Sequence, residues 1–324
     1  MKWAILTEYS FIIVAIGTMC LAMAAGMVGT VTMLKGQSLI GDAIGHASLP
    51  GVILAFMLSG RKHILVLLSG ALIAGVIAFL LVQLICETTK IEADTAMAVV
   101  LSAMFGLGMV LNSYIQGNEA YQRASQSGLK NYIFGQAAYL LREDVLIIFG
   151  AALLSLTVFA LFYKEMKVYV FDASYAATIG IRHRLMSVLI MLMTMVLIAA
   201  GLKSVGAILI SSMLINPAIV GLQWSKRYGV VLAVAAAVGG ISALVGTAIS
   251  SLFYGFSTGP SITLCMSAAA LLSVVFGRYG LLFGRYGLSF GRCGLSFGRH
   301  GLPLGRCRRL HNRKQKDGEA EVGE

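Results

Sequence analysis

An acidic residue and a histidine lie one helical turn apart within an apolar part of the chain. They are Asp42 and His46, in the stretch Ser38-Leu-Ile-Gly-Asp-Ala-Ile-Gly-His-Ala-Ser-Leu-Pro-Gly51. At i,i+4 spacing both side chains project from one face of a helix. A carboxylate oxygen and a neutral imidazole nitrogen suit Mn²⁺, Fe²⁺ or Zn²⁺. An ionisable side chain inside a bilayer costs about 2.5–3.5 kcal/mol on insertion scales, so the pair predicts a functional site, here half of a divalent-metal site.

The same residues allow a simpler interpretation. Asp42 could cap or hydrogen-bond the start of a helix, and His46 could be a buried histidine whose ring is satisfied by that carboxylate. The metal hypothesis needs a second copy, because one chain offers two ligands and two copies around an axis offer four. Two ligands without a closed cage suit transport, since a transported ion must also be released.

The composition is that of a membrane protein. The 324 residues are 58% hydrophobic and 12% charged, and the mean hydropathy is +0.85. This is too apolar for a soluble domain, so we expect an all-α, polytopic membrane bundle of eight or nine transmembrane helices. Apolar windows long enough to cross a bilayer lie at 9–34, 38–58, 64–85, 95–112, 145–163, 185–201, 204–222, 229–253 and 260–276. The count falls from nine to eight if two short windows merge.

Charge divides the chain into two parts, a transmembrane domain at 1–276 and a tail at 277–324. Residues 1–275 carry 15 Lys and Arg against 10 Asp and Glu, whereas residues 276–324 carry 10 against 4. With nine spans, the basic tail predicts a cytoplasmic C-terminus and an external N-terminus. With eight spans the N-terminus is also inside.

The tail consists of near-identical heptads. Four units begin Phe-Gly-Arg, starting at Phe276, Phe283, Phe290 and Phe297. Two glycines in each unit argue against a stable helix, so we expect a mostly disordered cytoplasmic segment. Its arginines could instead bind anionic lipid headgroups, with RNA or metal binding as the remaining alternatives.

Two loops are long enough to have a role of their own. The polar loop from Asn112 to Asp144 could dock an extracytoplasmic partner, or be a solvated connection with an amphipathic helix around Leu129–Leu141. The loop at 164–184 predicts a compact cytoplasmic knob. It contains a short helix, with Asp172 near the N-terminus and Gly180 at the C-cap.

The sequence lacks the motifs of an enzyme. It has no G-x-x-x-x-G-K-[ST] loop and no arrangement of nucleophile, base and orienting group. The five cysteines show no C-x-x-C spacing, which argues against a disulfide framework or a zinc cluster. We therefore expect a transport subunit that binds no cofactor permanently, and no nucleic-acid partner.

Four motifs, in this order, resemble the membrane-permease subunits of manganese, zinc and iron ABC importers. They are the Ser38–Gly51 stretch, then Tyr132-Ile-Phe-Gly135 with Asp144 downstream, then Phe171–Gly180, and finally Leu202-Lys-Ser-Val-Gly206 leading to Leu214-Ile-Asn-Pro-Ala218. The resemblance extends from about residue 10 to residue 275. Four matches in family order are specific, although each short motif alone is weak.

The resemblance implies a permease of the type II ABC importer kind in the bacterial inner membrane. It implies three partners: a cytoplasmic ABC ATPase, an extracytoplasmic metal-binding protein, and a second permease in a homo- or heterodimer. It places Asp42 and His46 on the path of the transported Mn, Zn or Fe ion. It assigns ATPase coupling to Phe171, Asp172, Ala176, Gly180 and Arg182, and helix packing or the ion pathway to Pro50, Gly51, Gly206, Asn216 and Pro217.

Two other functions stay open at this point. An importer of larger metal chelates, such as siderophores or cobalamin, would need a wide pore and no ligand pair. An ion-coupled secondary carrier would use Asp42 and His46 as a proton relay. The sequence shows no inverted repeat, which counts modestly against the carrier.

Overall fold

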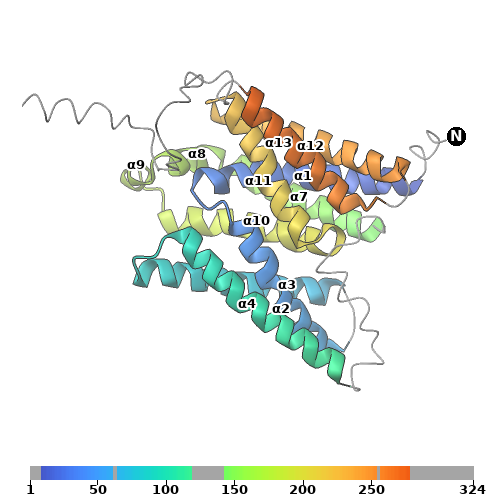
Figure 1. Ribbon diagram of the computed structural model, residues 1–324. Helices are drawn as coiled ribbons and strands as arrows, with labels where there is room; N and C mark the ends of the chain where they lie inside the picture. Colours follow the sequence, from blue (N-terminus) through green and yellow to red (C-terminus); the bar gives the residue numbers. More distant parts are fainter. Residues whose placement is uncertain (1–8, 61–63, 119–141, 254–255, 278–324) are drawn as a thin grey trace, which may run out of the picture. The chain divides into compact units, whose positions relative to one another are not determined.

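The computed structural model describes residues 9–60, 64–118, 142–253 and 256–277, which belong to one compact unit (Figure 1). Three predicted features lie outside these ranges: the Tyr132–Gly135 motif, the amphipathic helix near Leu129–Leu141, and the repeat tail beyond Gly277. The described residues form helices and their connections, as expected for an all-α membrane protein. The helices are α1 (Tyr9–Leu34), α2 (Ile40–Ser59), α3 (Ile64–Thr88), α4 (Ala93–Gly117), α7 (Arg142–Leu161), α8 (Tyr163–Phe171), α9 (Ala173–Thr178), α10 (His183–Val205), α11 (Ala207–Trp224), α12 (Tyr228–Leu252) and α13 (Thr258–Phe276).

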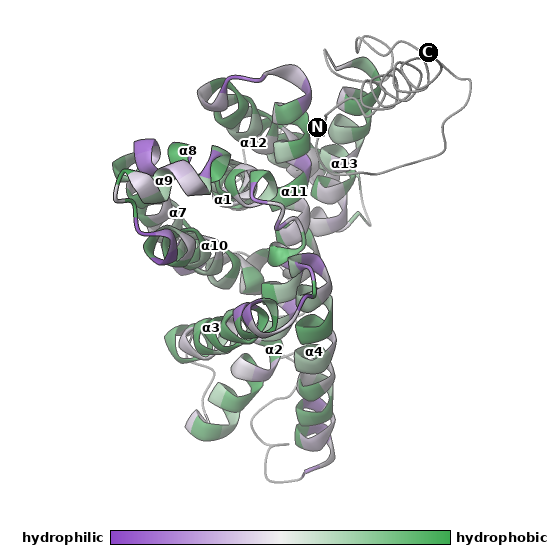
Figure 2. Cartoon of the chain, turned by 90° about the vertical axis from the view of Figure 1, so that its left-hand side faces the viewer, coloured by the Kyte–Doolittle hydropathy of each residue, from purple (hydrophilic) through white to green (hydrophobic). Residues whose placement is uncertain are grey.

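Each apolar window of the sequence corresponds to one helix. Within the described residues, eight helices are long and apolar enough to cross a membrane, and a ninth, α11, has a shorter apolar stretch at Leu209–Trp224. The two short windows do not merge, because Gly206 separates α10 from α11 with a φ of 84°, a conformation that favours glycine. Figure 2 shows hydrophobic residues over most of α3, α4 and α13, as expected for surfaces in contact with lipid.

Contacts between helix ends show the relative direction of α1 and α7. The Arg142 guanidinium at the start of α7 lies 4.7 Å from the ring centroid of Tyr9 at the start of α1. At the other end of α1, Lys35 lies over the ring of Tyr169 in α8. Helices α1 and α7 therefore run in the same direction, and the α8–α9 segment lies at the end where both finish (Figure 1).

Helix α2 begins inside the bundle and not at its surface. Its first turn packs against α11, where a Cβ on Gly41 would meet the side chain of Leu214. The backbone of Leu214 is in turn pressed against Gly29 of α1, five residues before α1 ends at Leu34. At 1.5 Å per residue, this level is roughly 7 Å in from the end of α1. Ile40, Gly41, Ala43 and Ile44 at the start of α2 are accordingly buried.

Close approach of two backbones fixes α2 against α3. A Cβ on Gly51 would collide with the carbonyl oxygen of Gly70, and the reverse holds for Gly70. Gly51→Ala is therefore expected to separate the helices and lower stability by about 1–3 kcal/mol, the usual cost of overpacking. The measurement is the thermal midpoint of the solubilised protein. Gly106→Ala is the matched control, since a Cβ on Gly106 of α4 would meet nothing within 4 Å. Equal midpoints for the two variants would contradict this packing role.

Candidate functional site

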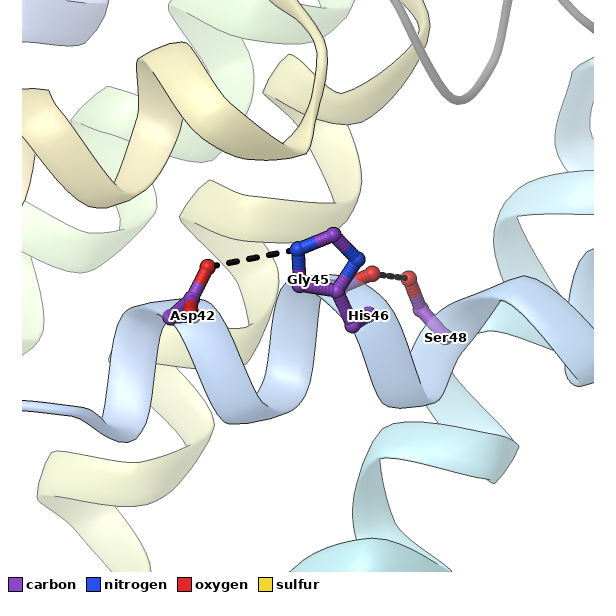
Figure 3. A network of polar contacts seen from close by, with 4 residues as sticks. All are labelled: Asp42, Gly45, His46 and Ser48. Carbon is purple, nitrogen blue, oxygen red and sulfur yellow. Dashed lines mark hydrogen bonds and ion pairs between the residues drawn. The ribbon is translucent and has the colours of Figure 1, made fainter. Parts of the chain in front are cut away.

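Asp42 and His46 interact directly on α2 (Figure 3). His46 Nε2 lies 3.4 Å from Asp42 Oδ1, and both side chains leave the same side of the helix. Leu39, and not Asp42, is the N-cap residue of α2, and no side chain caps the helix there. The capping interpretation of Asp42 is therefore wrong. The carboxylate instead contacts the imidazole. Two interpretations of this contact are left, a metal site and a simple hydrogen-bonded pair.

The surroundings of the pair hold the imidazole but leave both groups accessible. The His46 ring packs edge-on against Phe105 of α4, with ring centroids 5.1 Å apart and an interplanar angle of 79°. The side chains of His46 and Asp42 are 22% and 38% exposed, although most residues of α2 are buried. An ion could thus reach both groups from the open side. No described residues form a group of three or more His, Cys, Asp or Glu that could hold a metal, so further ligands would have to come from elsewhere.

Pro50 lies one turn beyond His46 within the same helix. Helix α2 continues through Pro50 to Ser59, as the apolar window at 38–58 predicts. Proline has no N–H group, so the backbone carbonyl of His46 loses its usual i+4 donor. Gly51 follows at the crossing with α3. The helix persists across the missing bond because it packs here against α3 and α4, where a Cβ on Gly108 of α4 would meet Leu49 and Pro50.

Gly206, Asn216 and Pro217 belong to α11, the helix that supports the first turn of α2. Gly206 is the N-cap of α11, and Pro217 lies within the helix. Asn216 Nδ2 donates hydrogen bonds to Ser212 Oγ at 2.9 Å and to Ser267 Oγ of α13 at 3.0 Å. The amide therefore ties α11 to α13. These contacts give Asn216 a packing role, and its place on the ion pathway stays a prediction.

The α8–α9 segment has the local structure that the sequence predicts around Asp172. Asp172 is the N-cap of α9, and its Oδ1 accepts a hydrogen bond from the Tyr175 N–H at 2.9 Å. After α9, the Gly180 N–H donates to the Ala177 carbonyl and the Ile181 N–H to the Ala176 carbonyl. This is a Schellman motif, and Gly180 adopts the positive φ of 84° that the motif requires. Helix α8, before Asp172, was not predicted.

Three apolar side chains of this segment are exposed outside the long helices. Phe171, Tyr175 and Ile179 are 60%, 56% and 53% exposed, and we call them the α9 apolar surface. Ala176 faces the opposite way and is 1% exposed, so it anchors α9 to the domain. Arg182 is exposed and is the N-cap of α10. The coupling roles of these residues stay predictions at this point.

Sequence reasoning missed several residues that contact the candidate sites. Phe105, Tyr169 and Tyr228 each contact a residue distant in sequence, and His183 contacts Tyr169 from the start of α10, 14 residues further along the chain. An aromatic residue in an apolar window has no spacing signal that reveals its contact. Tyr175 and Ile179 lie within the predicted knob, and their size and apolar character in a polar loop are the signal that could have identified them.

The fold and the acid–imidazole pair define a multi-pass helical membrane protein with an ionisable pair inside its transmembrane domain. The chain belongs to the ABC 3 transport family, whose model matches residues 8–277. It is accordingly a multi-pass permease of the bacterial cell membrane.

Two relatives illustrate the family. The chain is 39% identical over 259 residues to the manganese transport system membrane protein MntC of Bacillus subtilis, a match that covers 80% of this chain and 59% of that protein. It is 36% identical over 271 residues to the zinc transport system membrane protein TroC of Treponema pallidum, covering 84% and 90% of the two chains. The chain thus spans less than two thirds of the Bacillus protein and most of the Treponema protein.

Solved structures agree with this assignment. A chain of PsaBC from Streptococcus pneumoniae, solved in complex with Fab, superposes with a TM-score of 0.74 at 26% identity, and the match covers 88% of this chain and 97% of that one. An inward-facing, putative metal-chelate type ABC transporter superposes with a TM-score of 0.61 at 15% identity, covering 81% and 84%. The second likeness concerns the fold alone.

Proposed function

We propose that this chain is the membrane permease of an ATP-driven importer of Mn²⁺ or Zn²⁺, with Fe²⁺ as the third ion that its ligands suit. The observation that carries the proposal is the 3.4 Å contact between His46 and Asp42 on a helix that begins inside the transmembrane domain. Oxygen and imidazole nitrogen are suitable ligands for these ions. The names of the relatives, manganese and zinc transport system membrane proteins, support the same ions.

A second permease completes the proposed ligand set. Each chain supplies one carboxylate and one imidazole, and both side chains are partly exposed, as contact with another copy requires. Four ligands of this kind are enough for a transient four-coordinate site. A homodimer or a pair with a related permease would serve equally, because only the ligand types matter to the chemistry.

The energy and the ion are proposed to come from two other partners. A cytoplasmic ABC ATPase would bind the α9 apolar surface, since large apolar side chains exposed outside the membrane mark a protein interface. An extracytoplasmic metal-binding protein would deliver the ion at the opposite end of the helices. In this scheme Asp172 and Gly180 set the shape of α9, and Arg182 lies beside the interface.

The test is metal uptake into proteoliposomes that contain the full chain together with its ATPase and its binding protein. We expect uptake of radioactive manganese or zinc that requires both ATP and the binding protein, and competition among Mn²⁺, Zn²⁺ and Fe²⁺ identifies the ion. Uptake driven by a proton gradient without ATP would instead indicate a secondary carrier. Uptake of a siderophore or cobalamin complex, and not of the free ions, would indicate a chelate importer.

A further inference from the structure

One side-chain contact links α8 to the connection that precedes the helix carrying Asp42 and His46. The Lys35 ammonium lies 3.5 Å from the ring centroid of Tyr169 in α8. Tyr169 is 1% exposed and is among the largest fully buried side chains of the described residues. Lys35 follows α1 directly and precedes the start of α2 by five residues. The contact therefore lies between the two functional parts of the chain.

Tyr169 is also held from its other side. Its hydroxyl lies 3.3 Å from His183 Nε2 at the start of α10, within hydrogen-bond distance. The two rings pack edge to face, with centroids 5.0 Å apart and an interplanar angle of 81°. Because His183 comes directly after the α9 turn, Tyr169 is fixed both to its own helix and to the end of the α8–α9 segment. Lys35 is the residue that meets this fixed ring from the direction of α2.

The connection from Lys35 to α2 is short, and hydrogen bonds join it to both helices. The Gly36 N–H donates to the Met33 carbonyl at 3.0 Å, and the Gln37 N–H donates to the Thr32 carbonyl at 3.0 Å. Gly36 has a φ of 73°, which allows this tight turn. These two bonds tie the turn to the end of α1, and the Ile40 N–H donates to the Gln37 carbonyl at 3.4 Å, which joins the turn to the start of α2. Movement of this turn is therefore expected to reach the start of α2 through the backbone.

The aromatic ring is the group that holds the Lys35 charge. Among the described residues, Lys35 forms no ion pair with a carboxylate. Burial lowers the pKa of Lys35 to about 8, which leaves the side chain charged at neutral pH. A half-buried ammonium over a ring face is attracted by the ring quadrupole, and partial desolvation strengthens this attraction. The charge and the ring are both needed for the contact.

We propose that Lys35 is a positioning residue for transport, whose contact with Tyr169 transmits movement of the α8–α9 segment to the metal-binding helix α2. This inference rests on the proposed function, since it presumes that the α8–α9 segment meets an ATPase and that α2 carries the ion. Lys35 itself binds neither the ion nor ATP. Removal of the Lys35 side chain should therefore allow ATP hydrolysis that is not coupled to metal transport. Loss of a metal ligand should instead prevent the ion from binding.

The experiment measures metal uptake and ATP hydrolysis in the same proteoliposomes of the complete transporter. Lys35→Met is expected to lower the metal transported per ATP by about fivefold or more, as for a typical coupling between two sites, with ATPase binding retained. Lys35→Arg keeps a cation over the ring and is expected to stay close to the wild-type ratio. Lys90→Met is the matched control, because Lys90 is an exposed lysine in the α3–α4 turn. A wild-type ratio in Lys35→Met would overturn the inference.

A double-mutant cycle tests whether Lys35 and Tyr169 act together. Tyr169→Leu should lower the ratio as Lys35→Met does, and the double variant should be no worse than either single one. Losses that multiply would show independent roles and overturn the inference. If Lys35→Met does not accumulate, Lys35→Gln replaces it, with equal ratios for Lys35→Gln and Lys35→Arg as the overturning result.

Asp42→Asn separates failure of this inference from failure of the proposed function. If the wild type transports metal and Asp42→Asn does not, the proposed function stands, and the Lys35 variants then decide the inference alone. If the wild type moves no metal with ATP, the proposed function fails first. The inference falls with it, because the segment then has no transport cycle to drive.

Discussion

Asp42→Asn is expected to lower metal uptake more than about 100-fold, because loss of groups that merely orient a metal ligand already costs 10- to 100-fold. Asparagine keeps the size of the side chain and can still hydrogen-bond His46. It removes only the negative charge and the anionic oxygen that would bind the cation. His46→Ala should have a similar effect, since it removes the imidazole nitrogen. The measurement is radiometal uptake by cells, with the amount of permease in the membrane determined in parallel.

The control for this prediction is another acidic residue in the first turn of a membrane helix. Asp94 is exposed in the first turn of α4, as Asp42 is in the first turn of α2. Asp94→Asn is expected to transport as the wild type does, because Asp94 lies outside the proposed site. If Asp42→Asn also transports normally, the pair is a hydrogen-bonded structural feature, and the metal site has to be sought elsewhere in the domain.

The long helices were predictable because each depends on one local property. A window of about 20 apolar residues crosses a bilayer wherever it stands in the chain, so length and hydropathy are sufficient. The boundary between α10 and α11 also has a local cause, the positive φ of Gly206. The turn after α9 was predictable for the same reason, since Asp172 and Gly180 are the residues that its caps require.

The arrangement of the candidate site was not predictable in the same way. In a membrane helix, the faces toward lipid and toward other helices are both apolar, so hydropathy does not tell which neighbour a residue meets. Nothing in the sequence indicated that Phe105 packs on His46 or that Lys35 lies over Tyr169. The i,i+4 spacing predicted the contact between Asp42 and His46, because both residues belong to one helix. Contacts within an element follow from the sequence, and contacts between elements need the fold.

The second large effect is expected at the α9 apolar surface. Tyr175→Ser combined with Ile179→Ser should release the ATPase from the complex and abolish uptake, since each exposed anchor of an interface contributes about 2 kcal/mol or more when it is a hot spot. The fold should persist, because these side chains are more than half exposed and Ala176, which anchors α9, is unchanged. The measurement is co-purification of the ATPase with the tagged permease, together with metal uptake.

Phe256→Ser provides the comparison for the α9 variant. Phe256 is 58% exposed, close to the 56% of Tyr175, but it follows α12 and precedes α13, at the end opposite Tyr228. Tyr228 contacts Phe171 of the α9 apolar surface, with ring centroids 5.9 Å apart, so Phe256 lies at the far end of α12 from that surface. Loss of the ATPase only in the α9 variant would locate the interface at α9. Equal retention in both variants would remove the support for α9 as the ATPase contact. The proposed metal site would be unaffected, because its ligands, Asp42 and His46, lie on α2 and not on α9.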